Sequence, residues 1–311
     1  MLSAAMAFSM HSHSGQFCPG HAKDDLEEVI LAAIARGMKT FAFTEHMPRE
    51  SVEDLYPEEI AAGDDTSSHI PRHSLFLLEA TRLRTKYASQ IHILIGFEGE
   101  WIRPSYGPFI TSFASSPVVD FFIGSVHHVH GLPIDYDKKF YSEAVEKSGS
   151  EEQLFVDYFD LQYEMLGELK PRVVGHFDLI RLLASEPDAE LESMGSGIVW
   201  ERVLRNLQRV KEQGGLLEVN SAGLRKGLRE PYPGKKICEV WKGMGGRFTL
   251  SDDSHGVVQV GTNYLRMFEF LRDLGVNEVW TFESKEGENE GKRELMYKMV
   301  GMDEVRASFR E

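Results

Sequence analysis

The chain has 311 residues, of which 42% are hydrophobic and 27% are charged, and its formal net charge is −15. This length suits a single α/β barrel, which commonly reaches about 250 residues or more. The acidic excess argues against nucleic acid as a partner, because phosphate backbones attract basic surfaces. No apolar run approaches the roughly 20 residues that span a bilayer, so we expect no membrane partner.

Short β-type runs alternate along the chain with longer amphipathic patterns, which is typical of βα units around a parallel sheet. The predicted strands are residues 7–13, 40–45, 91–98, 119–126, 173–176, 216–220, 248–252 and 278–282. The predicted helices, which end at a glycine or before a proline, are residues 24–36, 152–169, 200–213 and 264–274.

No linker rich in proline, glycine and serine divides the chain, so we expect one domain over residues 1–311. Three charged, irregular segments, near residues 49–73, 135–150 and 185–197, are long enough to be insertions over one face of the barrel. Long loops of this kind are usually functional or disordered.

Two histidines two positions apart, His11 and His13, follow the first apolar run. In an extended strand, residues i and i+2 point to the same face, so both rings can reach one metal ion.

Nearly every later strand also ends in a residue that can bind a metal ion or an anion. These residues are His46, Glu98, His127, His176, Glu218, Asn220, Asp252, Asp253 and His255. Each has an ordinary alternative role, such as a core histidine or a helix cap. Carboxylates are nevertheless poor core residues, and the carboxyl ends of parallel barrel strands converge on one mouth. We therefore expect these side chains to form one site.

Other histidines fit this pattern less well. His128 and His130 are alternatives to His127, which we prefer because it directly follows its strand. We expect His69 and His73, in the first predicted insertion, to be exposed to solvent.

Six short motifs resemble, in the same order, those of the PHP (polymerase and histidinol phosphatase) superfamily. They are HSHSGQFCPGH, TEH, GFE, GSVH, GHFD and SDDSH. They span almost the whole chain. Within the superfamily, FCPGHAKD, GHFDLIRL and EVNSAGLRKG are similar to the monofunctional histidinol-phosphate phosphatases.

The resemblance implies a distorted (β/α)7 barrel that carries three divalent metal ions, with zinc, manganese and iron all compatible with imidazole and carboxylate ligands. By resemblance, the ligands of the first ion are His11, His13 and Asp253. Glu98 bridges this ion to a second one, which His127 and His176 also bind. The ligands of the third ion are His21, His46 and His255. Asp252 stands where the family usually has a small residue, so Asp252 and Asp253 could exchange roles.

The implied activity is metal-dependent hydrolysis of L-histidinol phosphate to L-histidinol and phosphate. Bound metal ions can lower the pKa of water to about 7, which gives a nucleophile without a phospho-enzyme. Glu98 is catalytic in this scheme as the bridging ligand. Asp253, His255 or a metal-bound water could each serve as the general acid.

Arg181 and Arg225 are candidates for binding the phosphate, because a guanidinium matches phosphate oxygens in a bidentate fashion. Salt bridges on helix surfaces are their alternative roles. Three aromatic residues could stack on an imidazole ring of the substrate, namely Phe17, Trp101 and Tyr232. Glu45 and Glu100 are candidates for orienting the histidine ligands.

Two other functions fit the same residues: a phosphoesterase for nucleotides or other small phosphate esters, and a metal-binding module without catalysis. The opening segment MLSAAMAFSM lacks the basic region of a secretory signal, so we expect a cytoplasmic enzyme. Cys18 and Cys238 are then expected to be free thiols.

Overall fold

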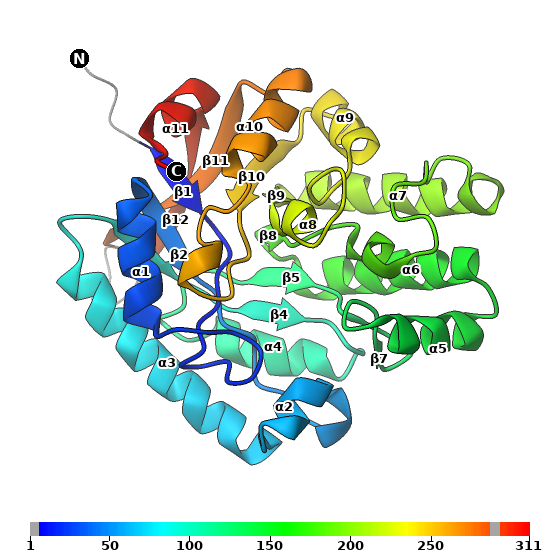
Figure 1. The fold of residues 1–311 in the computed structure, drawn as a ribbon, viewed down its shortest axis with the longest axis horizontal. Coiled ribbons are helices and arrows are strands. Elements are labelled where there is room, and N and C mark those ends of the chain that lie inside the picture. Colours follow the sequence, from blue (N-terminus) through cyan, green and yellow to red (C-terminus); the bar gives the residue numbers. More distant parts are fainter. Residues whose placement is uncertain (1–5, 287–292) are drawn as a thin grey trace.

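The computed structural model describes residues 6–286 and 293–311, and there the chain forms a barrel of parallel strands inside a ring of helices (Figure 1). The barrel strands are β1 (Ala7–Ser9), β2 (Met38–Phe43), β3 (His92–Ile95), β4 (Glu98–Glu100), β5 (Ile123–Ser125), β8 (Val173–Val174), β9 (Leu216–Asn220) and β10 (Arg247–Ser251). These strands are short and almost entirely buried, as expected when both faces of a parallel sheet are covered, and most of them are apolar, with β4 (Glu98–Glu100) the exception.

The barrel is distorted because its strands form two ladders, β1-β2-β3 and β10-β9-β8-β5-β4. Strand β3 pairs with β2, and after Gly96 and Phe97 the same stretch of chain continues as β4 and pairs with β5. A Cβ atom at Gly96 would lie 2.7 Å from the Phe121 carbonyl oxygen, so this crossing needs a glycine. With β3 and β4 sharing one position, the described strands fill seven positions, and the predicted distorted (β/α)7 barrel is confirmed.

Single β-bridges join the two ladders at the mouth of the barrel. One pairs Ser12 with Ser254, and the other pairs His46 with Glu98. The backbone N–H groups of Met10 and His13 also donate to the carbonyl groups of Leu250 and Ser254. Candidate ligands therefore lie where the barrel closes.

The helices follow the strands on the outside of the barrel (Figure 1). They are α1 (Leu26–Ala35), α2 (Pro57–Ala61), α3 (Thr66–Lys86), α4 (Tyr106–Ala114), α5 (Lys138–Ser148), α6 (Glu151–Leu169), α7 (Ile198–Gln213), α8 (Ala222–Arg225), α9 (Lys235–Gly243), α10 (Tyr264–Asp273) and α11 (Met302–Ser308). Short 3-10 helices are η1 (Val52–Asp54), η2 (Leu179–Leu183), η3 (Met194–Gly197) and η4 (Val257–Gln259). The predicted helices 24–36, 152–169, 200–213 and 264–274 correspond to α1, α6, α7 and α10.

Two antiparallel hairpins lie outside the barrel ladders. The first pairs β6 (His128–Val129) with β7 (Leu132–Pro133), and the second pairs β11 (Glu278–Glu286) with β12 (Arg293–Gly301). The predicted strand at residues 278–282 thus belongs to a hairpin beside the barrel. The C-terminal helix returns to β1, where the Ser308 hydroxyl accepts the Ala7 N–H at 2.6 Å.

The first predicted insertion is not irregular, because residues 49–73 contain η1, α2 and the start of α3. The side chain of Asp65 caps α3, and Pro71 lies inside this helix and masks it in the sequence. The expectation that His69 and His73 are exposed is also wrong, since each is 6% exposed on the inner face of α3. Residues 135–150 likewise contain α5, while residues 185–197 contain only turns and η3.

Both cysteines, Cys18 and Cys238, are buried free thiols, as predicted. Among the residues that the structure describes, no helix combines the length and the apolar character needed to cross a membrane.

Candidate metal centre

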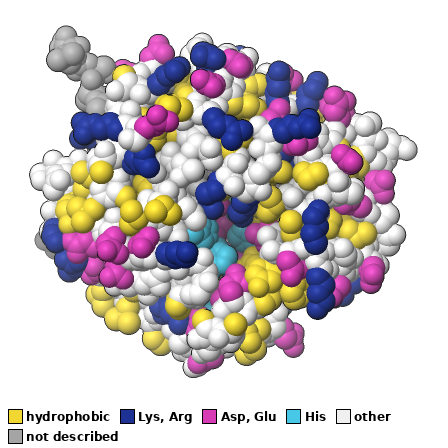
Figure 2. All heavy atoms as spheres, viewed as in Figure 1, with side chains coloured by type: hydrophobic (Ala, Val, Ile, Leu, Met, Phe, Trp, Pro, Cys, Tyr) yellow, Lys and Arg dark blue, Asp and Glu magenta, His cyan; other side chains and the backbone are white. Residues whose placement is uncertain are grey.

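A cavity of about 210 Å³ opens at the carboxyl ends of the barrel strands. Figure 2 shows its histidines at the bottom of a hollow in the middle of this face, with basic and acidic side chains around the rim. Its lining consists of His21, His46, Tyr56, Glu98, His127, Asp135, Tyr136, His176, Leu179, Lys226, Asp253 and His255. Seven of the nine side chains that the resemblance assigned to metal binding line this cavity, all except His11 and His13.

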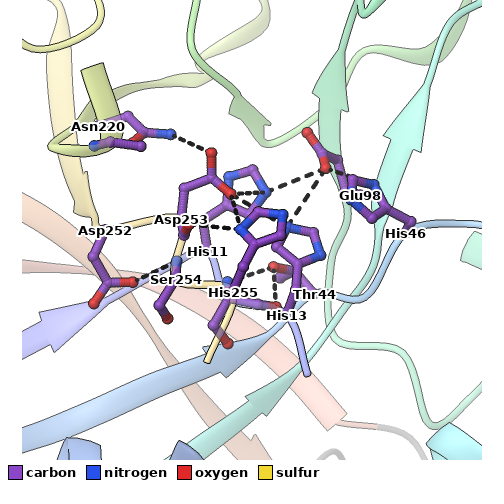
Figure 3. A network of polar contacts seen from close by, with 12 residues as sticks. His11, His13, Thr44, His46, Glu98, Asn220, Asp252, Asp253, Ser254 and His255 are labelled. Carbon is purple, nitrogen blue, oxygen red and sulfur yellow. Dashed lines mark hydrogen bonds and ion pairs between the residues drawn. The ribbon is translucent and has the colours of Figure 1, made fainter. Parts of the chain in front are cut away.

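His11, His13, Glu98 and Asp253 form the deepest group of donors (Figure 3). His13 Nε2 lies 3.3 Å from Asp253 Oδ1 and 3.7 Å from Glu98 Oε2. His11 Nε2 lies 3.4 Å from Glu98 Oε2 and 3.7 Å from Asp253 Oδ1. β1 ends at Ser9, but the backbone continues through the bridge at Ser12, so both rings still reach this point.

Glu98 also contacts a second pair of histidines through its other oxygen. Glu98 Oε1 lies 2.9 Å from His176 Nε2 and 3.3 Å from His127 Nε2. The two Nε2 atoms are 3.1 Å apart. The carboxylate therefore connects two donor groups, as expected of a bridging ligand.

His21, His46 and His255 lie closer to the surface. The ring centroid of His21 is 5.0 Å from that of His46 and 4.7 Å from that of His255. Donor atoms of His13, His46 and His255 lie within 4.8 Å of one another, whereas His21 belongs to no such group among the described residues. Three of the four such groups contain His11, His13 or both, and a fourth joins His46, Glu98 and Glu100.

Carboxylates hold the Nδ1 side of most of these rings. Glu218 accepts from His11 Nδ1 at 2.8 Å, and Glu58 on α2 accepts from His21 Nδ1 at 2.8 Å. Glu100 accepts from both His46 Nδ1 and His127 Nδ1, at 3.0 and 2.9 Å. Hydrogen bonds of this kind fix the ring so that Nε2 faces a metal ion.

The sequence-based prediction of these orienting residues was partly right. Glu100 has the expected place, and the Arg49 guanidinium lies 2.6 Å from its carboxylate. Glu45 instead accepts two hydrogen bonds from Ser14. Glu218 was expected in the site but not as the partner of His11, and Glu58, which no pattern in the sequence marks, was missed.

The donor sets fit divalent metal ions. His11 Nε2, His46 Nε2 and both ring nitrogens of His13 are buried and lack a hydrogen-bond partner within the described part of the chain. Leaving such atoms unpaired costs about 1–3 kcal/mol each, and a metal ion would satisfy them. Imidazoles combined with carboxylates could hold several such ions here.

Charges shift the pKa values in this cluster. Burial alone would raise the pKa of Glu98, but His127 and His11 hold it well below its usual range. Burial opposes protonation of His46, yet Glu100 and Glu98 raise its pKa to about 10. Burial and the neighbouring His46 lower the pKa of His13 to about 3. The carboxylates are thus ionised and ready to bind cations.

The geometry favours Asp253 over Asp252 as a ligand. Asp252 points away from the imidazoles (Figure 3) and accepts hydrogen bonds from Ser9 Oγ and from the backbone N–H groups of Ser254 and Gly261. Asp253 has a φ of 48°, a left-handed conformation that is rare for aspartate and that turns its carboxylate into the cluster.

The two predicted phosphate-binding arginines have other contacts. Arg181 donates to Asp178 at 2.9 Å and to the Pro231 carbonyl at 2.6 Å, and it does not line the cavity. Arg225 donates to the carbonyl group of Asp253 at 2.7 Å and so supports the left-handed turn there. Its neighbour Lys226 does line the cavity.

The aromatic residues at the cavity also differ from those expected. Trp101 and Tyr232 are buried, at 2% and 0% exposure, and neither they nor Phe17 line the cavity. Tyr56 and Tyr136 take this place. Both lie in or beside the predicted insertions, and no sequence pattern distinguishes them from packing residues.

A family model described as PHP domain matches residues 9–222. The chain belongs to the PHP domain family. The matched residues include all the strand-end donors up to Glu218, while Asp253 and His255 lie beyond them. The family predicted from the six motifs is therefore confirmed.

Related proteins cover most of this PHP chain. It is 43% identical over 285 residues to a Schizosaccharomyces pombe protein named "Probable histidinol-phosphatase", covering 89% of this chain and 90% of the relative. It is 34% identical over 298 residues to the Saccharomyces cerevisiae protein named "Histidinol-phosphatase", covering 86% and 88%.

A solved structure from Lactococcus lactis has the same fold as this PHP chain. It is a histidinol phosphate phosphatase complexed with zinc, L-histidinol and phosphate, and it superposes with a TM-score of 0.68 at 20% identity. The match covers 93% of this chain and 98% of the other.

Proposed function

We propose that this chain is a histidinol-phosphatase, a phosphoric monoester hydrolase that releases L-histidinol and phosphate from L-histidinol phosphate. The observation that carries the proposal is the cavity lined by imidazoles and carboxylates, in a chain whose relatives of this name align over nearly their whole length. The cavity of about 210 Å³ suits a small ester, since sites for drug-sized ligands usually measure about 300–1,000 Å³.

We propose three divalent metal ions, with the ligands that the family resemblance assigns. The first set is His11, His13, Asp253 and Glu98, the second is Glu98, His127 and His176, and the third is His21, His46 and His255. Bound divalent metal ions supply positive charge for the phosphate and a nucleophilic water at neutral pH. Zinc is our first choice of metal, because the L. lactis protein contains it.

The chain's own residues would bind and orient the ester. Lys226 lines the cavity and is placed to pair with the phosphate. Arg225 would act beside it while holding the Asp253 turn. Asp253 and His255, both at the cavity, remain our candidates for protonating the leaving alcohol. We also propose that the enzyme acts in the cytoplasm, where two buried thiols stay reduced.

A phosphate-release assay on the purified chain tests the proposal. With zinc or manganese added, histidinol phosphate should be hydrolysed faster than a nucleotide monophosphate or a simple alkyl phosphate. Equal or higher turnover of the nucleotide would point to the other phosphoesterase function. Full activity after metal stripping by a chelator, checked by elemental analysis, would contradict the metal-dependent mechanism.

A further inference from the structure

The lining of the cavity carries one carboxylate that the metal-binding donors do not include. This side chain, Asp135, lines the cavity but belongs to none of the clusters of metal-binding geometry found among the described residues. The other lining residues outside the donor sets are Tyr56, Tyr136, Leu179 and Lys226. The wall therefore combines one anion, one cation, two phenol rings and one aliphatic side chain.

Asp135 is held in place from both sides. The β6–β7 hairpin precedes it, and the Ile134 N–H donates to the His127 carbonyl group at 2.9 Å, which ties this segment to a strand end. The Tyr56 hydroxyl donates to Asp135 Oδ1 at 3.2 Å. Tyr56 itself is only 4% exposed and lies against His21, with ring centroids 5.7 Å apart.

Much of the hydrogen-bonding capacity of Asp135 is unused. A carboxylate can accept about four hydrogen bonds, and within the described residues only the one from Tyr56 reaches it. Burial alone would raise the pKa of Asp135, but His127 and Lys226 lower it; Lys226, on the same wall, makes no ion pair with it within 4.0 Å in that part of the chain. Asp135 is only partly buried and lines the cavity, so a ligand in the cavity can contact it.

We infer that Asp135 binds a nitrogen cation of the substrate, an ammonium or imidazolium group, and so makes the site specific for phosphate esters that carry positive charge. The inference rests on the proposed function and deepens it. The ester's phosphate would lie toward the donors and Lys226, and its cationic end toward Asp135. The rings of Tyr56 and Tyr136, with centroids 6.1 Å apart, flank that end and favour a cation beside them.

Four esters test the inference: histidinol phosphate, phosphoethanolamine with an ammonium group only, imidazole-ethyl phosphate with a ring only, and propyl phosphate with neither. Asp135→Asn should lower kcat/KM for histidinol phosphate about 30-fold, mainly through KM, and for propyl phosphate at most about 3-fold. Two of the esters carry a single cation, and the one whose kcat/KM falls more in Asp135→Asn identifies the nitrogen that Asp135 binds. Equal losses on histidinol phosphate and propyl phosphate would overturn the inference.

Two further variants complete the comparison. Glu146→Gln changes an exposed carboxylate on the same segment, outside the cavity, and should leave all four values unchanged. Tyr56→Phe removes the hydroxyl that orients Asp135, so it should lower kcat/KM about 3-fold, and only for the cationic esters.

Binding of L-histidinol, measured by calorimetry, separates failure of the inference from failure of the proposed function. If the wild type hydrolyses none of the esters, the proposed function fails. L-Histidinol should still bind about 10-fold more weakly to Asp135→Asn than to the wild type and Glu146→Gln. Equal affinity in all three proteins, or no binding to the wild type, would overturn the role of Asp135.

Discussion

His11 and His13 continue a buried strand and are fully shielded from solvent, whereas His21 lies on the loop before α1 with 25% of its side chain exposed. The first two are positioned by the barrel itself, through backbone bridges at Ser12. His21 is oriented by Glu58, which α2 contributes from the first predicted insertion. The comparison indicates that the barrel alone builds the deep donor groups, while the outer group depends on an added helix.

The largest effect should come from Glu98, which contacts both deep groups. Glu98→Ala should lower kcat/KM for histidinol phosphate about 1,000-fold or more, because it removes the carboxylate between buried imidazoles. Elemental analysis should show loss of metal, while circular dichroism shows a folded barrel. Glu98→Gln, which keeps the volume, is the matched control for packing. An active, metal-loaded Glu98→Ala would refute the bridging role.

Glu218 tests the deep group through the hydrogen bond that orients His11. Glu218→Gln should weaken metal binding about 10- to 100-fold, as is usual when a carboxylate partner of a histidine ligand loses its charge. Competition with a chelator measures the change, and Glu201→Gln, an exposed site on α7, serves as the control. Unchanged affinity would mean that the barrel orients His11 without Glu218.

Glu58 tests the outer group. Glu58→Gln should weaken the binding of one metal ion about 10-fold and leave the others bound. Dialysis should then lower the metal content by about one ion per chain. Glu53→Gln, an exposed neighbour in η1, should retain the full content. If all ions were lost together, the distinction between the two regions would be wrong.

The smallest effect should be a release of protons when metal binds to the metal-free protein. The raised pKa of His46, about 10, means that both of its ring nitrogens are protonated at neutral and mildly alkaline pH. His13, with a pKa of about 3, is a neutral imidazole there. A metal ion must displace the His46 proton, so affinity should rise with pH until the pH passes about 10.

Calorimetry in two buffers with different ionisation enthalpies measures this proton release. The heat of metal binding should differ between them by the ionisation enthalpy times the number of protons released. Identical heats in both buffers would contradict the charged state of His46.

Much of the barrel could be predicted because its strands are short apolar runs that end in polar ligands. That Glu98, His127 and His176 come together could be predicted for the same reason, although Glu98 begins β4 instead of ending the predicted strand 91–98. The left-handed turn that separates the roles of Asp252 and Asp253 depends on tertiary hydrogen bonds, which the sequence does not reveal. From the sequence, only the family resemblance favoured Asp253 as the metal ligand.

The parts that could not be predicted depend on contacts between distant segments. α3 was missed because Pro71 and a polar composition hide its inner face, which packs His73 against Phe113 with ring centroids 4.8 Å apart. Glu58 and Asp135 reach the site from outside the strands, where periodicity carries no positional information. Arg181 was a candidate for binding the phosphate, but its guanidinium forms an ion pair with Asp178, a contact that the sequence does not reveal.

The closure of the barrel between β1 and β10 has a consequence for how the protein is made. Ser9 and Asp252, which are hydrogen-bonded across this closure, are 243 positions apart in the chain. At about 5–20 residues per second, roughly 10 to 50 s of translation separate the emergence of His11 and His13 from that of Asp253. Until the end of that interval the nascent chain carries the imidazoles without Asp253. Assembly of the complete metal centre must therefore wait until the last barrel strand has left the ribosome.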